Sequence, residues 1–146
     1  MARTEPRLAY VIGRLDRALR RQLDDAVRPH GLTTPQYTAL SVLRARGGLS
    51  NAQLARRSFM TPQSMSEVVA ALLAKGLVRR DAHPTHGRIL LTELTPAGAT
   101  ALEACDEAVD RIEAQMVGEL NASERERLLD SLRSCVRMLG AGFADA

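Results

Sequence analysis

The spacing of apolar residues constrains this chain most, because such residues recur every three or four positions along most of its 146 residues. The first run, from Leu8 to Val27, is typical of an amphipathic helix that ends before Pro29 and Gly31. One stretch breaks the pattern. In "RRDAHPTHGRILLTELT", residues 79–95, a turn containing Pro and Gly separates two β-type runs. We therefore expect a mostly helical protein with one short hairpin.

Helix starts are marked by Ser, Thr or Asn followed three positions later by Gln or Glu. This spacing predicts a capping box, in which the two side chains satisfy each other's backbone N–H groups. The pairs are Thr33 with Gln36, Ser50 with Gln53, and Asn121 with Glu124. A further start is expected at Thr61, where Pro62 occupies the first helical position.

The middle of the chain predicts a winged helix-turn-helix. A helix of about two turns after Ser50 is followed by a helix that begins at Thr61 and ends at Gly76. The hairpin follows directly as the wing. The predicted fold is therefore mainly α with a small β-hairpin wing. Its winged helix-turn-helix lobe covers residues 33–95, and a helical dimerisation lobe is formed by residues 1–32 and 96–146.

The last two helices carry more apolar surface than one small domain can cover. The helix that starts at Thr95 and Pro96 should be about 24 residues long and span roughly 36 Å. The first helix and the last two helices each carry an apolar stripe. These stripes are most simply buried against a second copy of the chain. A homodimer is the leading inference, and the alternative is that the last two helices cover only each other.

Charge is distributed unevenly along the chain. Residues 34–92 hold eight Arg or Lys against two acids, whereas residues 93–146 hold five against eleven. A basic middle segment is typical of a surface that meets a polyanion, although solvated helix faces would also explain it. No apolar run of membrane-spanning length or signal peptide stands out, so a cytoplasmic protein is expected. We find no catalytic constellation, and we expect no enzyme activity, no cofactor and no bound metal.

The ordered segments "LTTPQYTALSVL", "LSNAQLARRSFMTPQSMSEVVAALLAKGLVRR" and "HPTHGRILLTELTPAG" resemble the MarR (multiple antibiotic resistance regulator) family of bacterial transcription factors. The resemblance covers about residues 8–140. It implies a DNA-binding homodimer joined through the first and last two helices, with each recognition helix in a major groove and each wing toward the adjacent minor groove. It also implies a repressor that is released from a pseudo-palindromic operator by a small molecule.

The residues expected to contact double-stranded DNA lie on the two helices of the motif and on the wing. Gln63, near the start of the recognition helix, is a good partner for adenine, and the arginines would attract phosphates. We interpret Glu67 as facing solvent or pairing with an arginine, rather than accepting from cytosine. The full set is Ser50, Asn51, Arg56, Arg57, Thr61, Gln63, Ser64, Ser66, Arg79, Arg80, His86 and Arg88.

The wing departs from the family pattern at His86. An acidic residue usually stands two positions before the wing arginine, so the carboxylate that would brace Arg88 is missing here. We therefore expect a looser and more basic wing tip. His83 and His86 are spaced like weak metal ligands, but solvated histidines are the favoured interpretation.

The resemblance places a small-molecule effector in the cleft where the first two helices meet the DNA-binding lobe. Tyr10, Arg14 and Tyr37 are the candidate lining residues, which would suit a phenolic or carboxylate compound. The alternative is that Tyr37 is a core residue and Arg14 a solvated charge. Two other functions stay open: a cysteine-based redox sensor, and a DNA-binding protein without a ligand. Cys105 and Cys135 fall in apolar stripes, where we expect buried, inert thiols.

Overall fold

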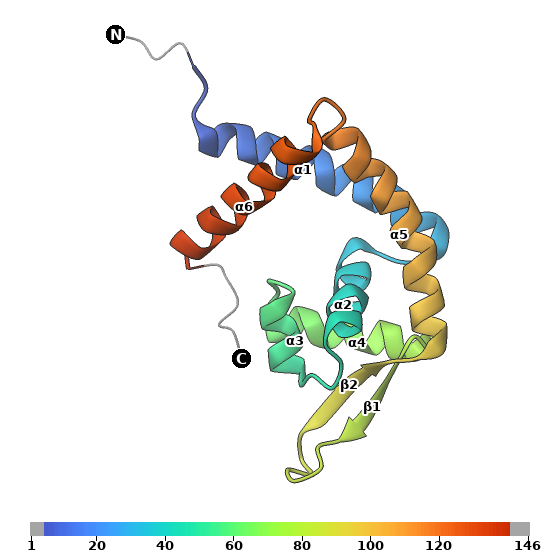
Figure 1. The fold of residues 1–146 in the computed structure, drawn as a ribbon. Coiled ribbons are helices and arrows are strands. Elements are labelled where there is room, and N and C mark those ends of the chain that lie inside the picture. The colour runs from blue at the N-terminus through green and yellow to red at the C-terminus, as the bar shows by residue number, and fades with distance from the viewer. Residues whose placement is uncertain (1–4, 141–146) are drawn as a thin grey trace. The chain divides into compact units, whose positions relative to one another are not determined.

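The computed structural model describes residues 5–140, which form six α-helices, one 3₁₀ turn and one hairpin (Figure 1). The first four and last six residues of the predicted dimerisation lobe lie outside this range. The mainly helical class with a hairpin is confirmed. The helices are α1 (Leu8–Val27), η1 (Arg28–His30), α2 (Thr34–Ala45), α3 (Asn51–Arg57), α4 (Pro62–Ala74), α5 (Pro96–Met116) and α6 (Ala122–Met138). The strands are β1 (Val78–Ala82) and β2 (Leu90–Leu94).

The helix starts lie where the sequence predicts them. All three predicted capping boxes are present, at the beginnings of α2, α3 and α6. At the start of α4, the Thr61 hydroxyl accepts a hydrogen bond from the backbone N–H of Ser64. Gly76 follows α4 with a φ of 70°, a conformation that glycine adopts without steric cost. Local capping chemistry thus sets the boundaries of the helix-turn-helix.

The first helix ends where the sequence predicts, and the fifth helix is shorter than expected. The α1 helix ends at Val27, before Pro29, and the chain then continues through the 3₁₀ turn η1, where proline occupies one of the first two positions and its fixed φ is tolerated. The α5 helix has 21 residues rather than about 24, since it ends at Met116 and turns before α6.

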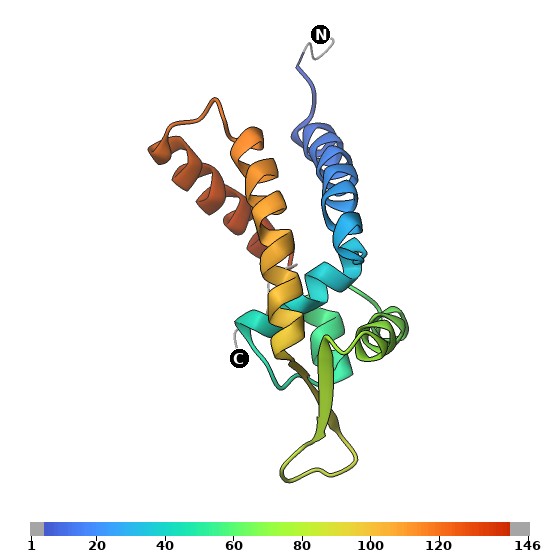
Figure 2. The same ribbon diagram turned by 90° about the vertical axis from the view of Figure 1, so that its right-hand side faces the viewer.

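The hairpin is tied to the helix-turn-helix by a third short segment. Its strands pair antiparallel, with Val78 opposite Leu94 and Ala82 opposite Leu90. Leu49, just before α3, forms an isolated bridge with the buried Thr92 of β2. Figure 2 shows the hairpin extending from this junction beyond the helices of the motif. The base of the wing is therefore held by the motif, while its loop is exposed.

One apolar core joins α2, α3 and α4 to the end of α1 and the first half of α5. Its largest fully buried apolar side chains are Leu40, Leu54, Met65, Leu72, Leu102, Val27 and Val69, with the thiol of Cys105 beside them. Truncating a buried Leu or Met of this kind to Ala typically costs about 2–5 kcal/mol. At one edge, the ammonium of Lys75 donates hydrogen bonds to the carbonyl of Gly31 and to Gln36 Oε1, the latter at 2.9 Å.

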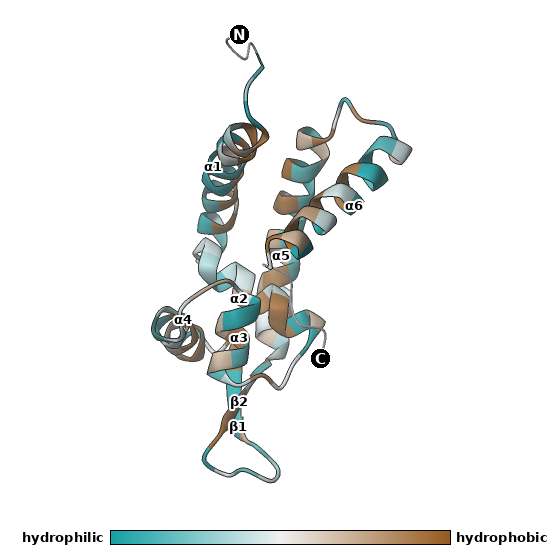
Figure 3. Cartoon of the chain, turned by 90° about the vertical axis from the view of Figure 1, so that its left-hand side faces the viewer, coloured by the Kyte–Doolittle hydropathy of each residue, from teal (hydrophilic) through white to brown (hydrophobic). Residues whose placement is uncertain are grey.

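The chain divides into two compact units, residues 1–112 and 113–146. The second unit contains α6, none of whose residues is buried. Figure 3 shows apolar positions along α1, α5 and α6 alternating with hydrophilic ones. No helix within residues 5–140 is long and apolar enough to cross a membrane.

Candidate functional site

The start of α4 presents a row of short polar side chains. Gln63, Ser64 and Ser66 are exposed, as is the capping residue Thr61. Thr61 and Ser64 are joined by a 3.0 Å bond between their hydroxyls, and the Ser66 hydroxyl donates to the carbonyl of Pro62 at 3.0 Å. The side-chain amide of Gln63 makes no hydrogen bond to any residue within 5–140. Its amide is therefore the member of this row whose donor and acceptor are both open to an external partner.

The first residues of α3 join the two helices of the motif. The Ser50 hydroxyl caps α3, and the side-chain nitrogen of Asn51 donates to the carbonyl of Pro62 at 3.0 Å. The other amide atom of Asn51, Oδ1, is buried and has no hydrogen-bond partner among the described residues. The Ser50 side chain thus fixes the start of α3, and the Asn51 side chain ties α3 to α4. The predicted contacts of Ser50 and Asn51 with DNA stay predictions.

The basic side chains of the motif and wing differ in their pairing. The guanidinium of Arg79 forms an ion pair with Asp81 at 3.1 Å, and both side chains are more than half exposed. Arg56, Arg80 and Arg88 are exposed and form no ion pair with a residue in the described part of the chain. Arg57 is half-buried. Three arginine charges are therefore available for phosphates, and among residues 5–140 Arg88 has no carboxylate partner.

The wing turn is organised by His83. Its Nδ1 accepts hydrogen bonds from the backbone N–H groups of Thr85 and His86, each at 3.1 Å. The two imidazole rings lie with their centroids 5.0 Å apart. No group of three or more potential metal-ligating residues occurs within residues 5–140. Sequence reasoning did not assign His83 this role, because a histidine gives no local signal for accepting from the residues that follow it.

Glu67 lies on the exposed side of α4, and no described residue forms an ion pair with it. Of the two favoured interpretations, the solvent-facing one therefore matches its place in the structure.

The three predicted effector-lining residues are in two different environments. Tyr10 and Arg14 are neighbours on α1, with the guanidinium carbon 6.0 Å from the ring centroid. Tyr37 lies on α2, and its hydroxyl donates to Asp106 Oδ1 on α5 at 2.8 Å. Arg44 forms an ion pair with the other oxygen of Asp106. Tyr37 is thus part of a polar cluster between α2 and α5, which we call the Asp106 cluster (Tyr37, Arg44 and Asp106).

Burial and the hydrogen bond to Asp106 raise the pKa of Tyr37 to about 12. For Asp106, burial acts to raise the pKa, but the hydrogen bonds from Arg44 and Tyr37 outweigh it and hold the pKa below its ordinary value. The same bond raises the pKa of Arg44. At neutral pH the cluster therefore consists of a carboxylate, a guanidinium and a neutral phenol.

The structure also has a cavity of about 480 Å³ that is separate from the Asp106 cluster. Its walls come from α1, from the start of α2 and from the turn between α3 and α4. None of Tyr10, Arg14 and Tyr37 lines it. The lining residues are Arg20, Asp24, Thr34, Pro35, Thr38, Ser58, Phe59 and Met60.

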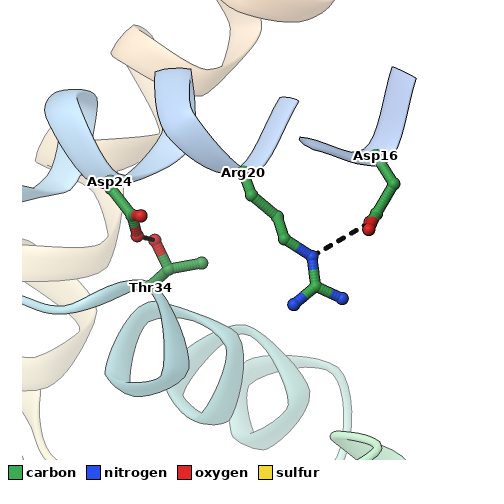
Figure 4. A network of polar contacts seen from close by, with 4 residues as sticks. All are labelled: Asp16, Arg20, Asp24 and Thr34. Atoms are coloured by element: carbon green, nitrogen blue, oxygen red, sulfur yellow. Dashed lines mark hydrogen bonds and ion pairs between the residues drawn. The ribbon is translucent and has the colours of Figure 1, made fainter. Parts of the chain in front are cut away.

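The polar side of this cavity is held by two contacts, which Figure 4 shows. The Nε of Arg20 donates to Asp16 at 3.0 Å, and the hydroxyl of Thr34 donates to Asp24. The terminal nitrogens of Arg20 have no partner among residues 5–140. A guanidinium with both terminal nitrogens open therefore stands beside a carboxylate at one side of the cavity.

The turn between α3 and α4 carries two unusual residues. Phe59 has a φ of 55°, and it is the one non-glycine residue with a positive φ in the described part of the chain. Such a conformation costs on the order of 1 kcal/mol or more, and here it accompanies a side chain that is 69 % exposed. The neighbouring Ser58 is 7 % exposed, and its hydroxyl has no hydrogen-bond partner within residues 5–140. Both residues line the cavity.

The two cysteines differ in exposure. Cys105 is buried, and burial followed by the nearby charge of Asp106 raises its thiol pKa. The thiolate that a redox sensor requires is therefore disfavoured at this position. Cys135 is exposed on α6 in the single chain, so the expectation of a buried thiol is wrong there. The expectation came from the apolar stripe of α6, a helix with no buried residue in the single chain.

Comparison with known proteins agrees with this architecture. Residues 30–89 match the model of the MarR family. The chain is 34 % identical over 130 residues to the HTH-type transcriptional repressor Rv2887 of Mycobacterium tuberculosis, which covers 87 % of this chain and 94 % of that protein.

Solved structures of the same relative are similar to the chain. Its complex with DNA gives a TM-score of 0.74 at 29 % identity, covering 90 % of this chain and 98 % of that one. Its complex with salicylic acid gives a TM-score of 0.73 at 31 % identity, with the same coverage.

Proposed function

Because this chain belongs to the MarR family of transcriptional repressors, we propose that it binds a pseudo-palindromic operator as a homodimer and is released by a small aromatic acid. In this proposal the recognition helix α4 enters the major groove and the wing approaches the adjacent minor groove. A regulator of this kind acts in the cytoplasm, where the chromosome lies.

The observation that carries the proposal is the combination on one lobe of an open Gln63 amide and unpaired basic side chains. Gln63 stands at the exposed start of α4, and Arg56, Arg80 and Arg88 have no internal ion pairs within residues 5–140. The first is suited to read a base edge, and the others are suited to neutralise phosphates. The similarity to a relative whose structure is a complex with DNA supports this assignment.

The apolar faces left open on the helical elements support a homodimer. On α1 and α6 the large exposed apolar side chains repeat at helical spacing. An unpartnered stripe of this kind is costly in water, and a two-fold axis would cover each stripe with its equivalent in the second copy. The exposed set on α1 and on α6 with its C-cap is Leu8, Tyr10, Val11, Ile12, Leu15, Leu128, Leu129, Leu132, Val136, Met138 and Leu139.

The effector part of the proposal is supported by the relative crystallised with salicylic acid. A ligand can displace the operator only if it binds more tightly to a conformation that does not match DNA. The ligand and the operator must then weaken each other by the same factor. The residues predicted from sequence, Tyr10, Arg14 and Tyr37, are one candidate location for the ligand.

Selection of duplexes from a random pool by the purified chain tests the proposal. We expect enrichment of sites with two related half-sites about one helical turn apart, because a symmetric dimer presents two recognition helices. Retained binding with no enrichment over the starting pool would contradict an operator-specific repressor. The stoichiometry of the selected complex, from sedimentation, should be two chains per duplex.

A further inference from the structure

We propose that His83 is a positioning residue for DNA binding, because its neutral imidazole caps the turn of the wing and so holds Arg88 in place. The wing turn comprises residues 83–89, between β1 and β2. The inference rests on the proposed function, in which the wing contacts DNA. His83 is not itself among the residues expected to contact DNA, so it acts through Arg88.

Backbone hydrogen bonds close the wing turn but leave two of its donors unpaired. The N–H of His83 donates to the carbonyl of Ile89, and the N–H of Ile89 donates to the carbonyl of His86, each at 2.8 Å. No backbone carbonyl among residues 5–140 accepts from the N–H of Thr85 or of His86. Two consecutive donors in the turn therefore depend on a side chain for their partner.

The imidazole of His83 is that side chain. Its Nδ1 accepts from the N–H groups of Thr85 and His86, each at 3.1 Å, and the Thr85 hydroxyl lies 3.3 Å from the same nitrogen. Asparagine and aspartate cap turns in a similar way, with a side-chain oxygen that accepts from the N–H two positions later. Pro84 suits such a turn, because its φ is fixed and it has no N–H to satisfy. His83 therefore does with a ring nitrogen what asparagine does with an amide oxygen.

These contacts decide which nitrogen of the ring carries the proton. A backbone N–H can only donate, so Nδ1 must offer a lone pair, and the neutral ring carries its proton on Nε2. Within the wing turn, His83 is the one residue that is only partly exposed, as expected of a ring folded over the turn. The cap is therefore an uncharged group with a defined orientation.

A neutral cap matters because of the charges around it. The hairpin carries Arg79, Arg80 and Arg88, and Asp81 already forms an ion pair with Arg79 at 3.1 Å. A carboxylate in place of the His83 ring could accept from the same two N–H groups, but it would subtract one unit of positive charge from the wing. The imidazole orders the turn and leaves the charge that attracts phosphates intact.

Arg88 lies between two anchored residues of the turn. His86 and Ile89 are each held through both their N–H and their carbonyl groups. The backbone of Arg88 is thus restrained, while its guanidinium has no ion-pair partner among residues 5–140. A side chain that leaves from an ordered backbone loses less conformational freedom when it binds. His83 therefore orders the tip of the hairpin (Figure 1), from which Arg88 is presented to DNA.

Amide hydrogen exchange, followed by NMR on the isotope-labelled full-length chain, tests the cap directly. The N–H groups of Thr85 and His86 should exchange several-fold faster in His83→Leu than in the wild type, and His83→Asn should restore slow exchange. Long-range proton–nitrogen correlations within the imidazole give the tautomer on the same sample. A proton on Nδ1 of His83, or unchanged exchange in His83→Leu, would overturn the cap.

Titration with the operator selected from the random pool, and with an unrelated duplex of the same length, tests the effect on DNA binding. We expect His83→Leu to weaken binding of both duplexes by roughly three- to tenfold, because Arg88 is no longer held in place. His83→Asn should recover most of this loss. His30→Leu removes an exposed imidazole outside the motif, so it is the matched control and should bind as the wild type does. The melting temperature of His83→Leu should be unchanged, because the wing turn contributes nothing to the apolar core.

A double-mutant cycle with Arg88→Ala distinguishes positioning from direct contact. If His83 acts through Arg88, then His83→Leu should have little further effect on affinity or on the salt slope in a chain that already carries Arg88→Ala. Equal losses in the presence and absence of the Arg88 side chain would mean that His83 contacts DNA itself or supports the whole wing. Either meaning contradicts a role in positioning Arg88.

The same titrations separate failure of this inference from failure of the proposed function. If the wild type binds its operator and His83→Leu binds it equally well, the proposed function stands and the positioning role fails. If the wild type binds both duplexes with equal affinity, the operator-specific function fails, while a non-additive cycle still supports the role of His83. If the wild type binds neither duplex, the proposed function fails and His83 is reduced to a structural cap.

Discussion

Asp106 lies beside two hydrogen-bond donors from a helix that is remote in sequence. Its two oxygens accept from Tyr37 and Arg44, which are 69 and 62 residues away along the chain. The carboxylate is only partly exposed, so these bonds are less weakened by solvent than those of a surface pair. The Asp106 cluster therefore fixes the approach of α2 to the first half of α5.

Replacing this carboxylate by an amide should destabilise the chain in a pH-dependent way. The native pKa of Asp106 is depressed, so its contribution is present above the unfolded value of about 3.9 and is lost as pH falls through the native value. We expect Asp106→Asn to lower the free energy of unfolding by about 1–2 kcal/mol at pH 7.

Urea unfolding at pH 7 and near pH 3 measures the effect. The difference between wild type and Asp106→Asn should shrink at the lower pH. Asp110→Asn, at an exposed position of the same helix, should stay close to the wild type at both pH values. An equal loss of stability at both pH values would show that the carboxylate charge is not the cause.

Among the elements, α5 and the hairpin meet at a place where only glycine fits. A Cβ added at Gly98 would lie 2.0 Å from the carbonyl oxygen of Leu77 and 2.9 Å from a methyl carbon of Leu94. The carbonyl belongs to the backbone, so a flexible side chain cannot relieve the clash. This close packing sets the angle at which the wing leaves the start of α5.

Gly98→Ala should consequently destabilise the chain by about 1–3 kcal/mol, through forced movement of the α5 start away from the hairpin. Gly87→Ala is the matched control in the same hairpin, because a Cβ there meets nothing within 4 Å. Thermal unfolding of both variants gives the comparison. Equal melting temperatures would mean that the junction is loose.

The recognition helix and the wing should differ in how they affect DNA binding. Gln63→Ala should cost roughly 1–3 kcal/mol on the selected operator and relax the preference at one position of each half-site. Arg88→Ala should instead weaken binding to operator and unrelated duplex by similar factors. It should also make the salt dependence shallower by about one per arginine removed.

Titrations of both duplexes at several salt concentrations distinguish these outcomes. An unchanged salt slope and unchanged affinities in Arg88→Ala would exclude the wing as a DNA contact. A uniform loss in Gln63→Ala, without relaxed preference, would make Gln63 a backbone contact rather than a base contact.

Elements whose boundaries depend on neighbouring residues were predictable from the sequence. Capping boxes act over three positions, so α2, α3 and α6 begin where their Ser, Thr or Asn residues predict. The pairing of Tyr37 with Asp106 and the bridge between Leu49 and Thr92 were not predictable, because they join residues far apart in sequence. The cavity was missed for the same reason: its walls come from three separate segments.

On the scale of the whole molecule, the exposed stripe of α6 is the feature that most calls for a partner. Leu132 is 40 % exposed and Leu139 is 86 % exposed, although both belong to the apolar stripe of this helix. Cys135 lies in the same stripe and is also exposed. A chain that leaves such a stripe in water is expected to associate with a second copy.

Leu132→Glu should therefore shift the protein toward monomers and weaken operator binding, because charges would meet across a two-fold interface. Ser134→Glu is the control. Ser134 lies two positions after Leu132, on the opposite side of the helix, so this variant adds the same charge away from the stripe. Sedimentation at micromolar concentration gives the oligomeric state. A wild-type chain that sediments as a monomer would contradict the dimer.

The contact of Lys75 with Gly31 and Gln36 has a practical consequence for chemical labelling. Lys75 is the single lysine in a sequence that has nineteen arginines. Amine-reactive dyes, cross-linkers and acyl donors therefore have one target besides the N-terminal amine, and this target is Lys75. The hydrogen bonds of the Lys75 ammonium tie the end of α4 to the start of α2. Immobilisation through amines would release this tie in the very molecules being measured, so surface-based binding assays of this protein should couple it through an added tag.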